Sequence, residues 1–342
     1  MPQKANRAAH RAIAGLLLVL SVGTGCSSRM ADAPPPTIEP ASAAVSPPVS
    51  AVPAGVVRPL GGRPQAAVFD ARISSLVVLS PGQPNTTLTL LGGPRVPPRS
   101  VVLPGPATAL TGDGRGAAYL SGRGGYFVVD LVGGTTARVD VNGEQDTDFT
   151  AIARRADGKL VLGSSDGAVY TMASDTAVAE RTKIFARVDS IVTQGNTAVI
   201  LDRGQTSVTT LDAQGRAKYA LRAGQGATTL AADPLGRVLV ADTRGDELLV
   251  FGVDPLILRQ AYPVRQAPYG LAGSRGLAWV SQTAANIVVG YDLATGIPVE
   301  KVRYPTVQQP NTLAFDDASG TLYVVSGSGA GVQVIEHAAG PR

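Results

Sequence analysis

The side chains in this sequence that could do chemistry are carboxylates, amides, tyrosines and arginines rather than thiols or imidazoles. Its 342 residues include one cysteine, Cys26, and two histidines, of which His10 lies near the N-terminus and His337 near the C-terminus. Ser-His-Asp catalysis, cysteine nucleophiles and histidine-ligated zinc or copper are not expected, because His10 and Cys26 belong to a predicted N-terminal leader and its attachment site, and His337 lies in the C-terminal tail. The sequence contains neither a G-x-x-x-x-G-K-[ST] phosphate loop nor a D-x-[DN]-x-[DN]-G calcium loop. What remains is recognition through charge and hydrogen bonds, or binding of a hard cation.

The candidate site residues flank short apolar segments. Carboxylate, amide and phenol oxygens suit a hard cation such as Ca²⁺, but no spacing requires one, so we predict no cofactor, with Ca²⁺ as the ion that the set could take. The structural alternative is that Asp202 and Asp242 end strands and cap turns, and that Asp-Arg neighbours are solvated pairs worth under about 1 kcal/mol. The candidates before apolar segments are Asp148, Asp189, Arg265, Tyr269, Gln309 and Asn311, and those after them are Asp202, Arg203, Asp242 and Arg244.

The elements that must position these residues form an internal repeat. Successive repeats begin 42, 42, 39, 39, 41 and 42 residues apart, the spacing of four-stranded propeller blades. With 40 Gly and 25 Pro among apolar stretches, the composition favours many short strands and turns. We predict an all-β, seven-bladed β-propeller, with a β-sandwich pair or a solenoid as alternatives. The repeats are anchored at Val68, Leu110, Ile152, Ile191, Leu230, Leu271 and Leu313.

Each repeat contains four strands, and the fourth is polar, as an outer edge that faces water must be. The last repeat ends after its third strand at Ile335, so we predict that Val56–Pro59 supplies its fourth strand and closes the ring. Trp279 lies in a second strand and is predicted to be core. The loops before the first strands and after the second strands should meet at the mouth of a central channel. Two residues before each anchor stand Ala66, Thr108, Thr150, Asp189, Thr228, Tyr269 and Asn311.

Several repeats resemble the YVTN and NHL classes of β-propeller repeat. Leu277-Ala278-Trp279-Val280 followed by Tyr291-Asp292-Leu293-Ala294-Thr295-Gly296 is similar to the strand-loop-strand unit that ends in D-x-x-T-G. Val240-Ala241-Asp242-Thr243 resembles the V-A-D-T step of NHL repeats. The resemblance covers about 280 residues and implies a fold rather than an activity.

Residues 1–25 have the pattern of an export signal. Lys4, Arg7 and Arg11 precede the apolar run Ala12–Val22, which is too short for a resident transmembrane helix. Removing these three from the 30 basic residues leaves 27 against 26 acidic ones, so the net charge falls from +4 to +1 and we predict no nucleic-acid partner. Gly23-Thr24-Gly25-Cys26 resembles a bacterial lipobox, which implies that Cys26 becomes lipidated, with palmitate among its acyl chains. The alternative is soluble secretion with an incidental cysteine.

Residues 27–53 are rich in Ala, Pro and Ser and show no periodicity, so we predict a semi-extended tether. Together, the lipobox, tether and repeats resemble conserved mycobacterial-type lipoproteins of the LppL kind. The resemblance implies an envelope protein that is anchored by lipid on the extracytoplasmic face of the cell membrane. The predicted organisation is a signal peptide at 1–25, lipidated Cys26 and tether at 26–55, a propeller at 56–337 and a tail at 338–342.

Three functions are compatible with this pattern. The favoured one is a monomeric binding or scaffolding module that recognises an envelope protein, peptide or glycan at the channel mouth. The second is an enzyme of the lactonase or hydrolase kind that uses a divalent cation, for which Asp148, Asp189 and Asn311 would have to converge. The third is a structural envelope component without a discrete site, for which side chains would close the mouth.

Overall fold

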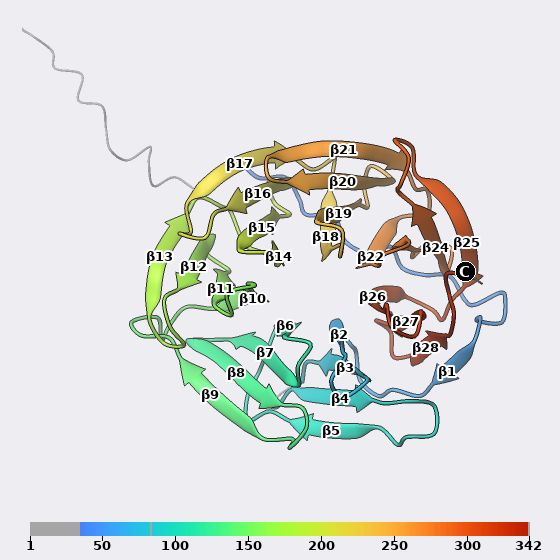
Figure 1. Cartoon of the computed structure of the whole chain (residues 1–342), viewed down its shortest axis with the longest axis horizontal. Helices are drawn as coiled ribbons and strands as arrows, with labels where there is room; N and C mark the ends of the chain where they lie inside the picture. Colours follow the sequence, from blue (N-terminus) through green and yellow to red (C-terminus); the bar gives the residue numbers. More distant parts are fainter. Residues whose placement is uncertain (1–34, 83, 341–342) are drawn as a thin grey trace, which may run out of the picture. The chain divides into compact units, whose positions relative to one another are not determined.

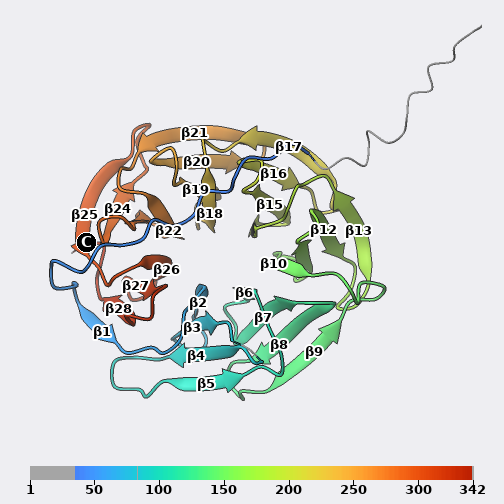
Figure 2. The same cartoon turned by 180° about the vertical axis from the view of Figure 1, so that it is seen from behind.

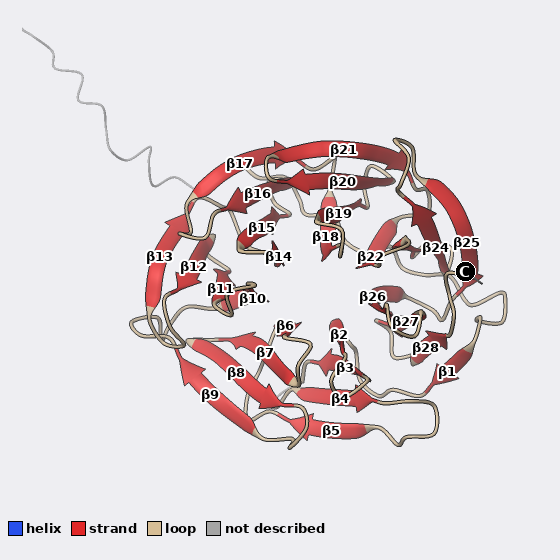
Figure 3. Ribbon diagram, in the orientation of Figure 1, coloured by secondary structure: helices blue, strands red, loops and turns tan. Residues whose placement is uncertain are grey.

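The computed structural model describes residues 35–82 and 84–340, and all their regular structure is β-strand (Figure 3). The strands form seven four-stranded antiparallel sheets arranged as the blades of a ring (Figure 1). The predicted seven-bladed β-propeller is therefore confirmed. The predicted signal and Cys26 lie outside the described residues. Within residues 35–82 and 84–340 there is no helix of the length and apolarity that a membrane crossing requires.

Each blade runs from an inner strand beside the channel to an outer strand at the rim. Blades 1 to 6 each use four consecutive strands, and blade 7 combines the last three strands with the first. Blade 1 contains β2 (Ala66–Asp70), β3 (Ser75–Ser80), β4 (Thr87–Leu91) and β5 (Arg99–Val102); blade 2 contains β6 (Ala109–Gly112), β7 (Ala117–Gly122), β8 (Gly125–Asp130) and β9 (Thr136–Asp140); blade 3 contains β10 (Phe149–Arg154), β11 (Leu160–Ser164), β12 (Ala168–Met172) and β13 (Val178–Lys183). Blade 4 contains β14 (Ser190–Gln194), β15 (Thr197–Asp202), β16 (Ser207–Leu211) and β17 (Ala217–Arg222); blade 5 contains β18 (Ala227–Ala232), β19 (Arg237–Asp242), β20 (Glu247–Val253) and β21 (Leu256–Pro263); blade 6 contains β22 (Pro268–Gly273), β23 (Ala278–Gln282), β24 (Ile287–Asp292) and β25 (Val299–Pro305); blade 7 contains β26 (Pro310–Asp316), β27 (Thr321–Ser326), β28 (Val332–Ile335) and β1 (Val56–Arg58).

The burial of each strand follows its place in the blade. All seven predicted anchors lie on inner strands. The second and third strands are almost wholly buried, because both faces of a blade are covered by neighbouring blades. The outer strands β13, β17 and β21 expose most of their residues, as their polar sequences predict.

The apolar core is divided among the junctions between blades. Each of seven buried clusters joins two neighbouring blades, and the one between blades 1 and 2 contains twelve buried residues. Trp279 is fully buried and stacks on Phe315 with ring centroids 5.5 Å apart, which confirms it as core between blades 6 and 7. The junction between blades 7 and 1 has the smallest cluster, with seven buried residues. Ring closure therefore depends less on apolar burial than the other junctions do.

Hydrogen bonds secure β1 as the outer strand of blade 7, and β1 is the strand whose connection to blade 1 closes the ring. β1 pairs with β28 through Val56, Val57 and Arg58, which confirms the predicted N-terminal clasp. Gln333 of β28 is fully buried, and its Nε2 donates to the carbonyl oxygens of Ala54 at 2.8 Å and Pro305 at 2.9 Å. Its Oε1 accepts from the Val307 amide at 3.0 Å. One glutamine thus ties the segment before β1 to the segment between blades 6 and 7.

The segment before β1 differs from the predicted tether. Residues 35–53 lie against the loops of blades 4 to 7, and Figure 2 shows this segment in blue, crossing from beside β17 past β19 and β22 towards β1. The prediction of a semi-extended tether did not include these contacts with the propeller. The physical reason is that loop side chains far away in the sequence donate hydrogen bonds to its carbonyl oxygens, which composition alone does not reveal.

We predict that Gln333→Leu lowers the melting temperature. The substitution leaves the Val307 amide and the Ala54 carbonyl without their partner, while the Pro305 carbonyl keeps the Ala54 amide. The cost is about 2–3 kcal/mol, which corresponds to a fall of about 4–10 °C in a domain of this size. Scanning calorimetry would measure it. Gln145→Leu, a change of the same type at an exposed loop residue, should shift the melting temperature by less than about 2 °C. Equal melting temperatures for the two variants would show that Gln333 does not secure the ring.

Candidate functional site

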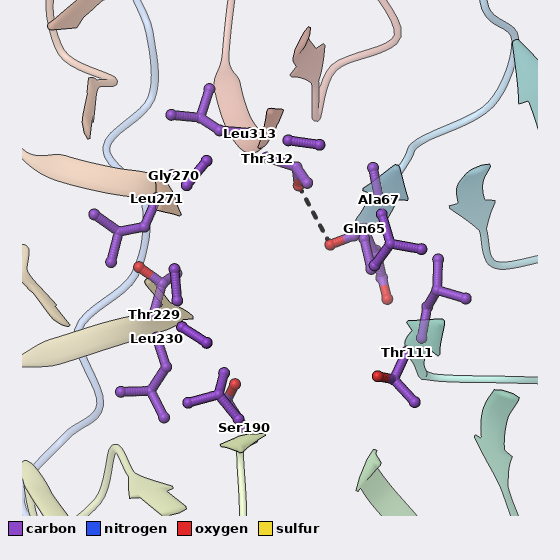
Figure 4. A pocket seen from close by; sticks show the side chains of 18 of the residues that line it. Gln65, Ala67, Thr111, Ser190, Thr229, Leu230, Gly270, Leu271, Thr312 and Leu313 are labelled. Carbon is purple, nitrogen blue, oxygen red and sulfur yellow. Dashed lines mark hydrogen bonds between the residues drawn. The ribbon is translucent and has the colours of Figure 1, made fainter. Parts of the chain in front are cut away.

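The candidate site is the mouth of the central channel. The channel has a volume of about 980 Å³ and is lined by the inner strands of all seven blades (Figure 4). The free edges of these inner strands face the channel, because each is hydrogen-bonded to its own blade only on the other side. Threonine side chains link neighbouring blades along this wall. The Thr312 hydroxyl donates to the Gln65 carbonyl at 3.4 Å (Figure 4), and the Thr193 hydroxyl donates to the Arg154 carbonyl at 2.8 Å.

The prediction of a ring two residues before each anchor holds for most members. Asp189, Tyr269 and Asn311 line the channel, as do Ala66 and Thr108. Of the residues that follow second strands, Arg203 lines the channel as well. A carboxylate, a guanidinium, a phenol and an amide are thus brought to one opening from blades 4, 6 and 7.

Two members of the ring are withdrawn into the blade junctions. The Thr150 hydroxyl donates to the Val188 carbonyl at 2.6 Å, which joins blade 3 to the loop that enters blade 4. Thr228 shares a 2.6 Å hydrogen bond with Thr243, whose hydroxyl in turn donates to the Pro268 carbonyl. These threonines stabilise the junctions and do not line the channel.

Asp189 has the most perturbed environment at the mouth. Its side chain is 13% exposed, and its carboxylate accepts from the Arg203 amide at 3.0 Å and pairs with Arg187 at 3.2 Å. Burial raises the pKa of Asp189, and the Asp202 carboxylate adds to this, while the bonds and charges of Arg203 and Arg187 oppose the rise without cancelling it. A carboxylate kept at a stability cost beside a channel is a feature of binding sites.

Asp202 and Asp242 are structural, as the alternative interpretation predicted. Both are fully buried at the ends of second strands. Asp202 accepts from the Ala186 amide at 2.7 Å and the Gln205 amide at 3.0 Å. Asp242 accepts from the amides of Gln225 and Gly226, each at 2.7 Å. These carboxylates hold the mouth loops in place and have no remaining face for a ligand.

Asp148 and Arg265 do not join the channel site. Asp148 borders a separate depression of about 500 Å³, formed over blade 2 with Arg123 and Arg138. Arg265 is exposed and lies outside both hollows. The predicted convergence of Asp148 with Asp189 and Asn311 is therefore not seen, because Asp148 belongs to another depression.

Gln309 and Arg244 contact the chain's own N-terminal segment. Gln309 Nε2 donates to the Ala44 carbonyl and to Asn311 Oδ1, at 2.8 and 2.9 Å, and Arg244 Nη2 donates to the Glu39 carbonyl at 2.7 Å. Arg203, besides lining the channel, donates to the Ala41 carbonyl. These three residues were predicted to bind a partner, and the partner that the structure places on them is residues 39–44.

Sequence reasoning missed some residues of this face. Arg63 and Gln65 line the channel from the loop that enters blade 1. The prediction took further residues, Asp148, Arg265 and Gln309, from the loops that enter later blades but none from the loop that enters blade 1. Asn286 and Gln308 bind the N-terminal segment, and no sequence signal marks them, because their partner is about 240 to 260 residues away.

Residues 35–82 and 84–340 contain no group of three or more His, Cys, Asp or Glu side chains placed to hold a metal ion. The oxygen donors at the mouth are instead spread among different blades, each beside its own arginine or amide. This arrangement suits recognition of a ligand with several polar groups better than chelation of one ion.

Comparisons with known proteins place the fold. No protein-family model and no curated protein sequence matches the chain. Among solved structures, streptogramin B lyase is similar with a TM-score of 0.66 and 10% identity, over 82% of this chain and 95% of that one. Hydrazine synthase of Kuenenia stuttgartiensis gives 0.65 and 15%, over 82% and 97%, and U3-55K gives 0.68 and 12%, over 84% and 99%. At these identities the likeness establishes a β-propeller and no activity.

We predict that Asp189→Asn becomes more stabilising as the pH rises. The raised pKa means that the native state holds this proton more tightly than the unfolded chain, so its contribution to the free energy of unfolding falls as the pH rises above the unfolded value of about 3.9. The asparagine side chain of the variant does not titrate, so the variant does not lose this contribution to the free energy of unfolding as the pH rises. Melting temperatures of variant and parent between pH 4 and 7 would show a difference that grows with pH. Thr108→Val, at the same mouth but without a titrating group, should give a constant difference, and a constant difference for Asp189→Asn would contradict the prediction.

Proposed function

We propose that this protein is a lipid-anchored envelope protein whose propeller binds a protein, peptide or glycan partner at the channel mouth. The observation that carries the proposal is the channel of about 980 Å³, at whose opening Asp189, Arg203, Tyr269 and Asn311 gather. The channel is not filled by side chains, which argues against a purely structural propeller. A concave site with a few convergent polar groups is the usual form of a recognition site.

The electrostatics of the mouth support binding. Burial raises the pKa of Asp189, so the free protein carries a carboxylate that is poorly solvated and only partly compensated. A partner that brings an amide, hydroxyl or ammonium donor to this carboxylate would restore what burial removed. Tyr269 offers an amphipathic ring of the kind enriched where proteins bind one another.

The hydrolase alternative receives less support. It requires Asp148, Asp189 and Asn311 around one ion, whereas Asp148 borders the depression over blade 2 and the other two line the channel. The likeness to streptogramin B lyase is one of fold at 10% identity. We therefore propose a binding module rather than a catalyst.

The proposal predicts that mouth substitutions abolish capture of a partner. From solubilised envelope, the chain carrying Asp189→Ala, Tyr269→Ala and Asn311→Ala should capture about tenfold less of the partner than the parent chain does, or less still. The reason is that interface contacts of this kind are worth about 1–2 kcal/mol each. Quantitative mass spectrometry of the captured proteins and glycans would measure the loss.

A matched control is available on the outer surface. Asp175, Tyr219 and Asn142 are exposed and line neither hollow. Their triple alanine variant should capture the same partner as the parent. If the mouth variant and the parent capture the same set, or if the parent captures nothing, the channel mouth is not a site for an envelope partner.

The anchor is tested separately. Cys26 is the sole cysteine of the chain, so incorporation of a clickable palmitate analogue reports on it directly. We expect the parent and a Ser27→Ala variant to be labelled and to enter the detergent phase, because two or more acyl chains anchor a protein stably. Cys26→Ala should take up no label. Label on Cys26→Ala, or none on the parent, would refute lipidation at this residue.

A further inference from the structure

We propose that the rim of the mouth over blades 4 to 7 is a binding groove for an extended, proline-rich polypeptide, and that residues 35–48 are the occupant it holds within the same chain. The groove is distinct from the channel and shares only Arg203 with it. The inference stands on the contacts of the segment itself, whether or not a partner enters the channel.

The groove binds its occupant mainly through hydrogen bonds to the backbone carbonyl oxygens. Side chains from four consecutive blades each donate N–H groups to a carbonyl, and only two amides of the occupant, those of Ile38 and Ser46, are used in return. In order along the segment, Arg244 Nη2 donates to Glu39 O at 2.7 Å, Arg203 Nη2 to Ala41 O, Gln309 Nε2 to Ala44 O at 2.8 Å, Gln308 Nε2 to Ser46 O at 3.2 Å and Asn286 Nδ2 to Pro47 O at 2.8 Å.

A row of donors suits proline-rich sequence in particular. Proline lacks an N–H group, so a segment rich in it offers mainly acceptors, and its extended conformation costs little entropy to bind. Residues 35–48 include Pro35, Pro36, Pro40, Pro47 and Pro48. An ordinary peptide would bring further N–H groups to a surface that already supplies the donors.

The groove also contacts the side chains of two residues of the occupant, Ala41 and Ser46. Ala41 is 8% exposed, and a Cβ at Gly226 would lie 2.9 Å from the Ala41 Cβ, so the glycine makes room for it. Ser46 is 4% exposed; its hydroxyl donates to the Thr283 carbonyl at 2.6 Å and accepts from the Gln309 amide at 3.0 Å. The groove therefore requires a small residue and, five positions later, a serine.

The occupant is held in a way that permits exchange. Val45 is 90% exposed and Ile38 is 37% exposed, so little apolar surface is buried. The clasp that closes the ring uses Ala54 and β1, which follow the groove segment in the chain. Residues 35–48 can therefore leave without opening the ring. Because they are tethered, they compete with an external peptide at an effective concentration of about a millimolar.

The experiment displaces the occupant without changing the groove. In the full chain purified in detergent, Ala41→Trp with Ser46→Trp cannot fit the two buried positions. The probe is a fluorescein-labelled peptide with the sequence of residues 35–50, followed by fluorescence anisotropy. We expect saturable binding to this double variant and at least tenfold weaker binding to the parent chain, whose own segment competes.

Two controls make the result specific. Adding Gln309→Ala and Arg244→Ala to the displaced chain should weaken probe binding at least tenfold. Two side-chain donors to carbonyl oxygens are lost, and so is Gln309 Oε1, which accepts from the Ser46 amide. A probe carrying tryptophan at the positions of Ala41 and Ser46 should not bind. Equal binding to the displaced chain and the parent, or unchanged binding after the loss of Gln309 and Arg244, would overturn the proposal. Neither failure would affect capture through Asp189, Tyr269 and Asn311.

Discussion

The structure depends on one constraint: every blade is a sheet with two apolar faces, and only another blade can cover them. Seven inter-blade clusters meet this requirement, and the ring must close for the last of them to exist. The closing cluster is the smallest, so backbone pairing of β1 and the buried amide of Gln333 supply what apolar contact does not. The channel follows from the same constraint, because the inner strands converge with one edge unpaired and no further strand can fill the space between them.

The mouth loops owe their shape to buried carboxylates. Asp202 and Asp242 accept hydrogen bonds from backbone amides of the loops that enter blades 4 and 5, and these bonds fix the turns of the loops. Gly224 shows how close this approach is, since a Cβ there would lie 1.9 Å from a carboxylate oxygen of Asp242. Rigid loops keep Asp189 buried beside the channel although burial disfavours its charged form. The same loops present the donors that hold residues 35–48.

The mouth face therefore has two halves with different surroundings. Over blades 4 to 7 the N-terminal segment covers the rim and leaves the channel open beside it. Over blade 2 the rim is hollowed, with Arg138 lying 5.0 Å above the Phe127 ring. A partner bound at the mouth, as we propose, would lie between the covered rim and this depression.

Local sequence determined the blades. Apolar strand segments, turn residues and the recurring anchors are visible within each repeat, so the strands, the seven blades and the N-terminal clasp could all be predicted, as could the placement of Asp189, Tyr269 and Asn311 at the channel. The tertiary structure alone decided the rest. Whether Thr150 faces the channel or a junction depends on a carbonyl of the loop that enters the next blade. Whether the Asp202 carboxylate is available to a ligand depends on the Ala186 amide, sixteen residues away in the loop that enters its own blade. Residues 35–53 were predicted to belong to a semi-extended tether because their composition cannot form a core, and nothing in that composition indicated that Asn286 and Gln309 bind them from more than two hundred residues away. Hydrogen bonds between distant polar groups leave no periodic trace in a sequence, and that is why the fold could be predicted while the occupant of the groove could not.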